Sequence, residues 1–208
     1  FPNPGASSLL ADWLEVVERT TRGFGTSSAV YLVFDGPLDP DSLPGAAATL
    51  AGPSPVMLVD VSGGPGHGER IPLRLRIFKE RRQFTPLNTL VLRPVEGFAL
   101  RASTRYAAVV TRGLADASGR LLGAEADFER TKYRVPPDDE RLRVWWESMQ
   151  PAYDALEELG LCEREEVAAL AVYTTQPVLA EMDAVRAFVA GRPVPQVRRW
   201  AALTYGER

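Results

Sequence analysis

The chain has 208 residues, with 24 lysines and arginines against 27 aspartates and glutamates, and a formal net charge of −3. At ~100–200 residues per domain, this length predicts one large domain, or one domain with an appendage. The acidic balance argues against a nucleic-acid-binding protein, and the lack of an apolar run of ~18 residues argues against a membrane span. With one cysteine and one histidine, the chain has no intrachain disulfide and too few ligands for a Cys/His metal cluster.

Residues 1–27 predict an N-terminal segment with one short helix. Within residues 7–22 apolar side chains recur at helical spacing, with Ser8 as the candidate N-cap. The glycines of the Gly23-Phe24-Gly25 stretch are expected to end this helix. The chain begins at Phe1 without a starting methionine, which fits a removed signal peptide, proteolytic trimming or an arbitrary boundary.

Residues 28–134 change to a period of two, which predicts a β-rich domain. In Ile71–Phe78, aliphatic residues alternate with Arg74 and Arg76, a pattern typical of a half-buried antiparallel strand. Short strands separated by turn residues, roughly ten residues apart, favour a β-sandwich. The expected strands are Val30–Phe34, Val56–Val61, Ile71–Phe78, Thr89–Val95, Thr104–Thr111 and Ala126–Tyr133.

Residues 135–208 predict a helix-strand-helix extension. A helix is expected from about Glu140 to Gly160, with Asp138 or Asp139 as its cap and a kink or break before Pro151. The expected elements that follow are a strand at Val167–Thr174, a helix at Pro177–Gly191, an extended Pro193-Val194-Pro195 linker and a further candidate strand at Val197–Tyr205. The predicted fold class is mainly β, an antiparallel sandwich with a short N-terminal helix and this α/β extension.

The residues that carry chemistry predict no catalytic site. No Gly-x-Ser-x-Gly sequence is present, as a serine hydrolase elbow would require. His67 lies in the flexible loop Gly63–Gly68, which would hold a general base poorly. Cys162 has acidic neighbours that disfavour its thiolate, so we interpret it as a small apolar filler.

No metal or cofactor is predicted either. Four aspartates, namely Asp35, Asp39, Asp41 and Asp60, could gather around Ca²⁺, but EF-hand spacing is missing and turn or cap roles are favoured. We expect the apolar face of the 138–160 helix to dock against a partner. The candidate residues of this interaction face are Trp145, Trp146, Met149 and Tyr153.

Part of the chain resembles bacterial immunoglobulin-like domains of the SbsA type. The opening pattern is the run Ala29–Leu43, in which a strand leads into Asp35-Gly36-Pro37 and then Leu38-Asp39-Pro40-Asp41-Ser42. Leu90–Pro94, Thr104–Val110 and the turn Gly113–Leu122 resemble the later strands and closing turn. Phe128 resembles the last strand, so the resemblance covers about residues 28–131. Tyr106 begins a strand after a loop, where its hydroxyl can bond backbone as in a tyrosine corner. Asp116 and Gly119 suit a tight turn.

The flanking segments resemble the N-terminal region of secreted bacterial lipase/esterase-like α/β hydrolases. The residues concerned are Gly23–Ser28 and Ala171–Gln176 with the helix that follows. In that family the immunoglobulin-like region precedes the catalytic domain. The resemblance implies a secreted or cell-envelope location and a partner that is the catalytic domain, or a second chain of the same precursor. The family's catalytic Ser, Asp and His have no counterparts here.

Three hypotheses follow. In the first, residues 1–27, 28–134 and 135–208 together form a non-catalytic region that packs on a hydrolase or regulates access to it. In the second, the chain is a stand-alone extracellular binding or adhesion module. In the third, it is a self-sufficient hydrolase with an unusual site that includes a serine or His67.

Overall fold

The computed structural model describes residues 7–83, 85–124, 126–193 and 196. Within them the strands form two antiparallel three-stranded sheets. The first has the order β1-β4-β3, from Val30–Val33, Thr89–Pro94 and Leu73–Phe78. The second has the order β2-β5-β6, from Val56–Asp60, Arg105–Thr111 and Val167–Thr174. The five expected strands before residue 112 and the strand near Val167 are therefore confirmed.

The second sheet is the middle layer of the fold. One of its faces packs on the first sheet, where Leu58, Ala108 and Val110 share a core with Leu90 and Leu92. Its other face packs on helices, so β2 is buried along its whole length. A strand buried on both faces reads as a continuous apolar run, whereas β3 keeps one solvated face and reads as an alternation.

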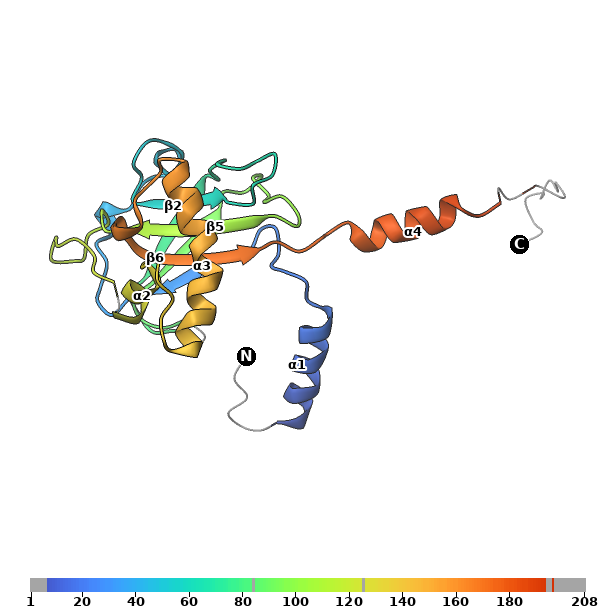
Figure 1. The fold of residues 1–208 in the computed structure, drawn as a ribbon, viewed down its shortest axis with the longest axis horizontal. Helices are drawn as coiled ribbons and strands as arrows, with labels where there is room; N and C mark the ends of the chain where they lie inside the picture. The colour runs from blue at the N-terminus through green and yellow to red at the C-terminus, as the bar shows by residue number, and fades with distance from the viewer. Residues whose placement is uncertain (1–6, 84, 125, 194–195, 197–208) are drawn as a thin grey trace, which may run out of the picture. The chain divides into compact units, whose positions relative to one another are not determined.

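Helices α2 and α3 form the third layer. Helix α3, Glu140–Glu158, crosses in front of β2, β5 and β6 in Figure 1. Its buried residues Met149, Tyr153 and Leu156 join a second core with Met57 and Val109 of the middle sheet. The Asp139 carboxylate caps it by accepting the Arg141 and Leu142 N–H groups at 2.9 and 3.2 Å. These N–H bonds lower the pKa of Asp139.

The remaining helices are short or exposed. Helix α1 spans Ser8–Thr20 and helix α4 spans Ala180–Ala190. The N-cap of α1 is Ser7, one residue before the expected one, since its hydroxyl accepts the Leu10 N–H. Single 3₁₀ turns occur at Pro40–Ser42, Ala48–Leu50 and Arg164–Glu166.

Three expectations need correction. The segment Ala126–Tyr133 is not a strand but contains helix α2, Ala126–Thr131, whose Phe128 and Thr131 are buried at a helical spacing of three. Six residues are too few to distinguish a period of two from one of 3.6. Helix α3 continues through Pro151, so of the two alternatives a break at this point is wrong. Among the described residues helix accounts for about 31% and strand for about 23%, so this part of the chain is mixed α and β rather than mainly β.

Residues 135–176 of the expected extension belong to the same unit as the strands that precede them. Strand β6 pairs with β5 in antiparallel register, from Arg105 opposite Thr174 to Val110 opposite Ala169. The chain divides into two units, Phe1–Gln176 and Pro177–Arg208. The candidate strand Val197–Tyr205 lies outside the described residues. No helix among the described residues is long and apolar enough to cross a bilayer.

The tyrosine-corner interpretation of Tyr106 is confirmed by its hydrogen bond. The Tyr106 hydroxyl is buried and accepts the backbone N–H of Arg101 at 3.0 Å. Burial raises the pKa of Tyr106 above its usual value. The expected turn is also present, since the Asp116 carboxylate accepts the N–H groups of Ser118 and Arg120 and Gly119 adopts a φ of 77°.

Replacing Tyr106 by phenylalanine is expected to lower the free energy of unfolding by about 1–2 kcal/mol, because the partly buried hydrogen bond from the Arg101 N–H loses its acceptor. Urea denaturation measures this loss. Tyr31→Phe is the matched control, since the Tyr31 side chain is 58% exposed, and a change within about 0.5 kcal/mol is expected there. Equal effects of the two substitutions would contradict the structural role of the corner.

Candidate interaction surface

A short bridge joins the two segments that lead out of the sheets. Phe24 forms a parallel β-bridge with Thr175, in which the Phe24 N–H donates to the Thr174 carbonyl at 2.9 Å. The Gln176 N–H donates in turn to the Phe24 carbonyl at 2.8 Å. Buried Thr175 secures this bridge, since its hydroxyl accepts the Thr104 N–H and donates to the Arg101 carbonyl. Helix α1 precedes the bridge in the chain, and helix α4 follows it.

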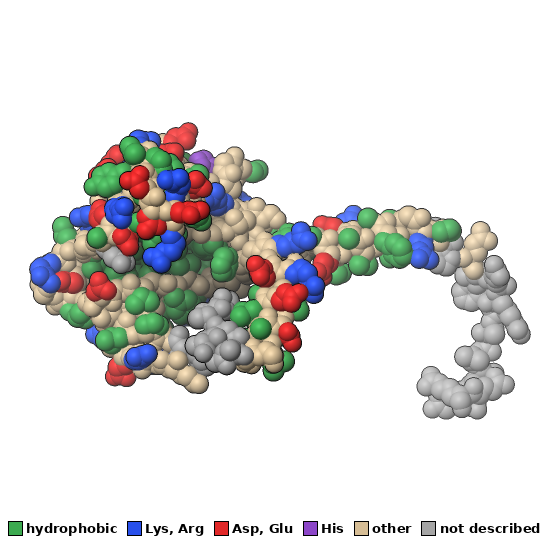
Figure 2. Space-filling view, turned by 60° about the horizontal axis from the view of Figure 1, so that its bottom comes forward, with side chains coloured by type: hydrophobic (Ala, Val, Ile, Leu, Met, Phe, Trp, Pro, Cys, Tyr) green, Lys and Arg blue, Asp and Glu red, His purple; other side chains and the backbone are tan. Residues whose placement is uncertain are grey.

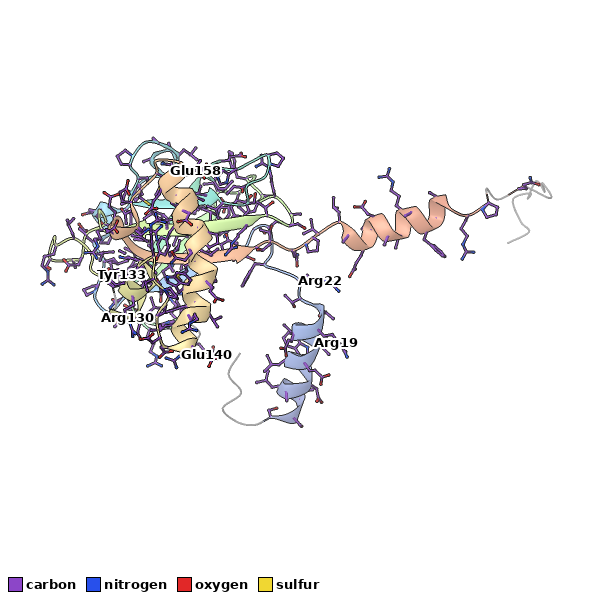
Figure 3. All side chains as sticks on the ribbon, viewed as in Figure 1. Arg19, Arg22, Arg130, Tyr133, Glu140 and Glu158 are labelled. Carbon is purple, nitrogen blue, oxygen red and sulfur yellow. The ribbon has the colours of Figure 1, made fainter. Side chains whose placement is uncertain are left out.

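Helix α1 has an apolar face that nothing in the described part of the chain covers. None of its residues is buried, and Leu9 and Trp13 are 77% and 66% exposed. Its other side carries charged side chains, among them Arg19. Figure 3 labels Arg19 and also Arg22, which follows the end of the helix. Isolated helices shorter than ~12–15 residues are marginal in water, so α1 gains stability only if its apolar face is covered.

Helix α4 presents an apolar surface of the same kind. None of its residues is buried, and Met182, Val185 and Phe188 are each more than half exposed. Figure 2 shows hydrophobic side chains along this helix. The acidic residues Glu181 and Asp183 in its first turn stabilise the helix N-terminus through the macrodipole. They do not cover its apolar side chains.

A small apolar pocket lies beside the bridge, between strands β1 and β6. Its volume is about 300 Å³. Phe24 meets Tyr173 edge to face there, with ring centroids 5.6 Å apart. The Tyr173 hydroxyl is buried without a hydrogen-bond partner among the described residues, and burial raises its pKa. The lining residues are Phe24, Ser28, Ala29, Val30, Tyr31, Ala171, Val172 and Tyr173.

The interaction face expected on α3 is not a free surface. Met149 and Tyr153 are buried, at 5% and 0% exposure, against the chain's own middle sheet. Trp146 is partly buried, and its indole N–H donates to the Tyr133 carbonyl at 2.6 Å. Figure 3 places Tyr133 and Arg130 beside the half of α3 that begins at Glu140. Of the four predicted residues only Trp145, at 48%, stays exposed.

The sequence pattern of α3 could not distinguish an internal partner from an external one. An amphipathic helix predicts that its apolar face is covered, but not by what. The apolar faces of α1 and α4 give the same signal, and only the structure shows that they remain uncovered within the described residues.

His67 has no catalytic geometry in the structure. Its Nδ1 accepts the Gly63 N–H at 3.2 Å, within its own loop. The Ser62 hydroxyl donates to the buried Asp60 carboxylate at 2.6 Å rather than to His67. These contacts order the loop around His67. The Arg101 guanidinium also forms an ion pair with the Asp60 carboxylate there. Ser62 therefore has no histidine base within hydrogen-bond reach, and its carboxylate partner Asp60 also accepts the Ser62 N–H at 2.9 Å.

Cys162 is buried, at 9% exposure, and packs in the core beneath α3. Burial first, and then the carboxylates of Glu166 and Glu163, raise its pKa to about 11. These findings agree with its interpretation as an apolar filler. At neutral pH its thiolate fraction is therefore very small.

Alkylation of Cys162 by iodoacetamide at pH 8 is expected to be about 100-fold slower in the folded chain than in urea, because the pKa falls by about two units on unfolding. The measurement is the rate of mass increase by one carbamidomethyl group. Rates within threefold of each other would show that the thiol is accessible and its pKa ordinary.

Two of the four aspartates considered for Ca²⁺ accept backbone N–H groups in turns. The Asp39 carboxylate accepts the Asp41 N–H at 3.0 Å, and Asp60 accepts the Ser62 N–H at 2.9 Å. Within the described ranges, a different group of three carboxylates comes together, formed by Glu157, Glu163 and Glu165. The charge of Glu157 is already paired there with Arg164 and Arg134.

No protein-family model matches the chain, and a comparison with curated proteins finds no match. Its function must therefore be argued from its own geometry.

Proposed function

We propose that the chain is the non-catalytic, immunoglobulin-like N-terminal region of a secreted bacterial lipase/esterase-type hydrolase, and that it packs on the catalytic part or regulates access to it. The observation that carries this proposal is a pair of exposed apolar helices. Helix α1 precedes the Phe24–Thr175 bridge in the sequence, and helix α4 follows it. Two sheets with a shared core and a tyrosine corner support the immunoglobulin-like assignment.

The apolar surface on these two helices is the reason why we propose a permanently bound partner. Single exposed apolar side chains are normal on protein surfaces, but grouped ones mark interaction sites. Trp13 and Phe188 are large aromatic side chains, which are enriched at the centres of protein interfaces. A catalytic domain that covers both helices would bury these side chains. It would also stabilise two helices that are marginal alone.

The chemistry of the described residues supports a non-catalytic role. Ser62 donates to Asp60, His67 is bonded within its loop, and Cys162 is a buried thiol. Neither Ser62 nor Cys162 is paired with His67, as the triad of a serine or cysteine hydrolase would require. The catalytic residues would then belong to the partner, which the proposal identifies as an α/β hydrolase with its own nucleophile elbow.

Hydrogen exchange compares the isolated 208-residue chain with the protein in its native assembly. In the isolated chain, amides of residues 8–20 and 180–190 are expected to exchange rapidly, while those of β5 are protected. In the assembly, the same helix amides should exchange about 100-fold more slowly. Unchanged exchange in the presence of the hydrolase would overturn the proposed contact.

Serine substitutions test the contribution of each helix to binding separately. Trp13→Ser and Phe188→Ser should each weaken association with the hydrolase about tenfold or more, as expected for aromatic residues central to an interface. Arg19→Gln, on the charged side of α1, is the matched control and should change little. A hydrolase that binds all three variants alike, or ester hydrolysis by the chain alone, would contradict the proposal.

A further inference from the structure

The outer face of the first sheet carries a concentrated positive charge. Opposed residues of neighbouring strands point to one face, and the register places Arg74 beside Arg93 and Arg76 beside Val91. Between residues 74 and 96 there are six cationic side chains and two carboxylates, a net charge of +4 in a chain whose net charge is −3. The six are Arg74, Arg76, Lys79, Arg81, Arg82 and Arg93. Charge is thus strongly segregated onto the β3–β4 hairpin.

Most of these cations are not neutralised by the protein. Glu96 is shared by Arg74 at 3.3 Å and Arg93 at 2.8 Å. Within the described part of the chain, no carboxylate lies within ion-pair distance of Arg76 or Arg82, or of the two other cations at the hairpin tip. All of these side chains are exposed. They are therefore free to meet an external anion.

Two of the guanidinium groups are held in place by an aromatic ring. Arg76 and Arg82 lie 4.7 and 5.0 Å from the centroid of the Phe78 ring. Cation–π contacts of this kind restrict a long side chain without removing its charge. The hairpin therefore presents ordered positive charge rather than freely rotating side chains.

The same surface also carries exposed apolar side chains. Tyr31 and Val33 stand on the outer face of β1, each 58% exposed, and Leu87 at the hairpin tip is 49% exposed. Aliphatic groups gain nothing from a soluble polyanion, but they gain free energy in the boundary between lipid headgroups and acyl chains. The combination therefore favours an anionic bilayer surface over a nucleic acid or an acidic polysaccharide.

We propose that the β3–β4 hairpin and the outer face of β1 bind reversibly to anionic phospholipid membranes. Arg76, Arg82 and their cationic neighbours contact the headgroup phosphates, and Leu87 and Val33 enter the interface. This binding goes beyond the proposed association with a hydrolase and uses neither α1 nor α4. It would concentrate the protein at an anionic lipid surface.

Co-sedimentation of the full chain with vesicles tests this proposal. Binding is expected with phosphatidylglycerol–phosphatidylcholine vesicles and not with phosphatidylcholine alone, and it should weaken as salt is raised. Arg76→Gln with Arg82→Gln should lower the partition constant about 25-fold, at roughly fivefold per cation. Arg19→Gln with Arg22→Gln removes the same charge from another region and should have little effect. Leu87→Ser should weaken binding about threefold or more.

Three results would overturn the proposal. The first is equal binding to both kinds of vesicle. The second is vesicle binding that is insensitive to the Arg76 and Arg82 substitutions but lost in Trp13→Ser, which would assign the contact to α1. The third is tight binding of heparin together with no effect of Leu87→Ser on vesicle binding, which would make the hairpin a site for soluble polyanions.

Discussion

Replacing Arg164 by methionine is expected to lower the free energy of unfolding by about 2–4 kcal/mol, because it leaves the partly buried Glu157 carboxylate and the buried Lys132 carbonyl without their donor. The Arg164 side chain is 4% exposed, and its Nε and Nη2 donate to the Glu157 carboxylate at 2.6 and 2.9 Å. It also donates to the Asp154 carboxylate at 2.8 Å and to the Lys132 carbonyl at 3.1 Å. This one side chain links α3, the segment after α2 and the turn before β6.

Arg134→Met is the matched control, since Arg134 contacts the same two carboxylates from the surface. Its Nη1 lies 3.2 Å from Asp154 and its Nη2 lies 2.8 Å from Glu157, but its side chain is 69% exposed. Such an exposed pair contributes about 0–1 kcal/mol. Denaturant unfolding of both variants gives the comparison. Equal losses would show that burial of Arg164 does not set its contribution.

The Arg164 variant should also change the response of the chain to acid. Hydrogen bonds from Arg164 hold the pKa of Glu157 below its usual value in the folded state. The unfolded state therefore binds more protons, so this contribution is present above the unfolded pKa and is lost as pH falls through the folded pKa. In Arg164→Met the unfolding free energy should fall less steeply between about pH 5 and 3.

Replacing Gly23 by alanine is expected to open the bridge between Phe24 and Thr175 and to cost about 2–3 kcal/mol. Gly23 has a φ of 143°, and an added Cβ would lie 2.7 Å from the Thr174 carbonyl oxygen. Backbone lies on that side, so the clash is relieved only if the two segments separate. The exchange protection of the Phe24 and Gln176 amides should then be lost, while β5 stays protected.

Gly36→Ala provides the control for the Gly23 substitution. Nothing lies within 4 Å of a Cβ added at Gly36, and a change within about 0.5 kcal/mol is expected. If Gly23→Ala leaves the Phe24 amide protected, the bridge does not hold the segments that lead to α1 and α4. The account of a common anchor for the two helices would then be wrong.

Most strands were predictable because their local signals are strong. In β3 the alternation of Arg74 and Arg76 with aliphatic residues shows which face is buried. The N-cap of α3 was predictable to within one residue, since either Asp138 or Asp139 precedes the long amphipathic run and the structure selects Asp139. Local propensity and pattern agree in these segments, so no long-range information is needed.

The place of β6 in the middle sheet could not be predicted in the same way. Its apolar residues indicate a buried strand, but its partner β5 lies far away in the chain and is set by tertiary packing. This pairing brings Thr175 to Phe24 and so creates the bridge. It also provides the sheet face that covers Met149 and Tyr153, which is why the interaction face expected on α3 is internal.

The mass of the native protein, measured without denaturation, tests the central claim most directly. The account predicts that the 208-residue region, of 22.8 kDa, occurs in a larger species. A hydrolase part would be either continuous with it or held as a second chain, and that species would have esterase activity. A stable, monomeric 22.8 kDa protein without such a partner would contradict the account. It would favour a stand-alone extracellular binding module.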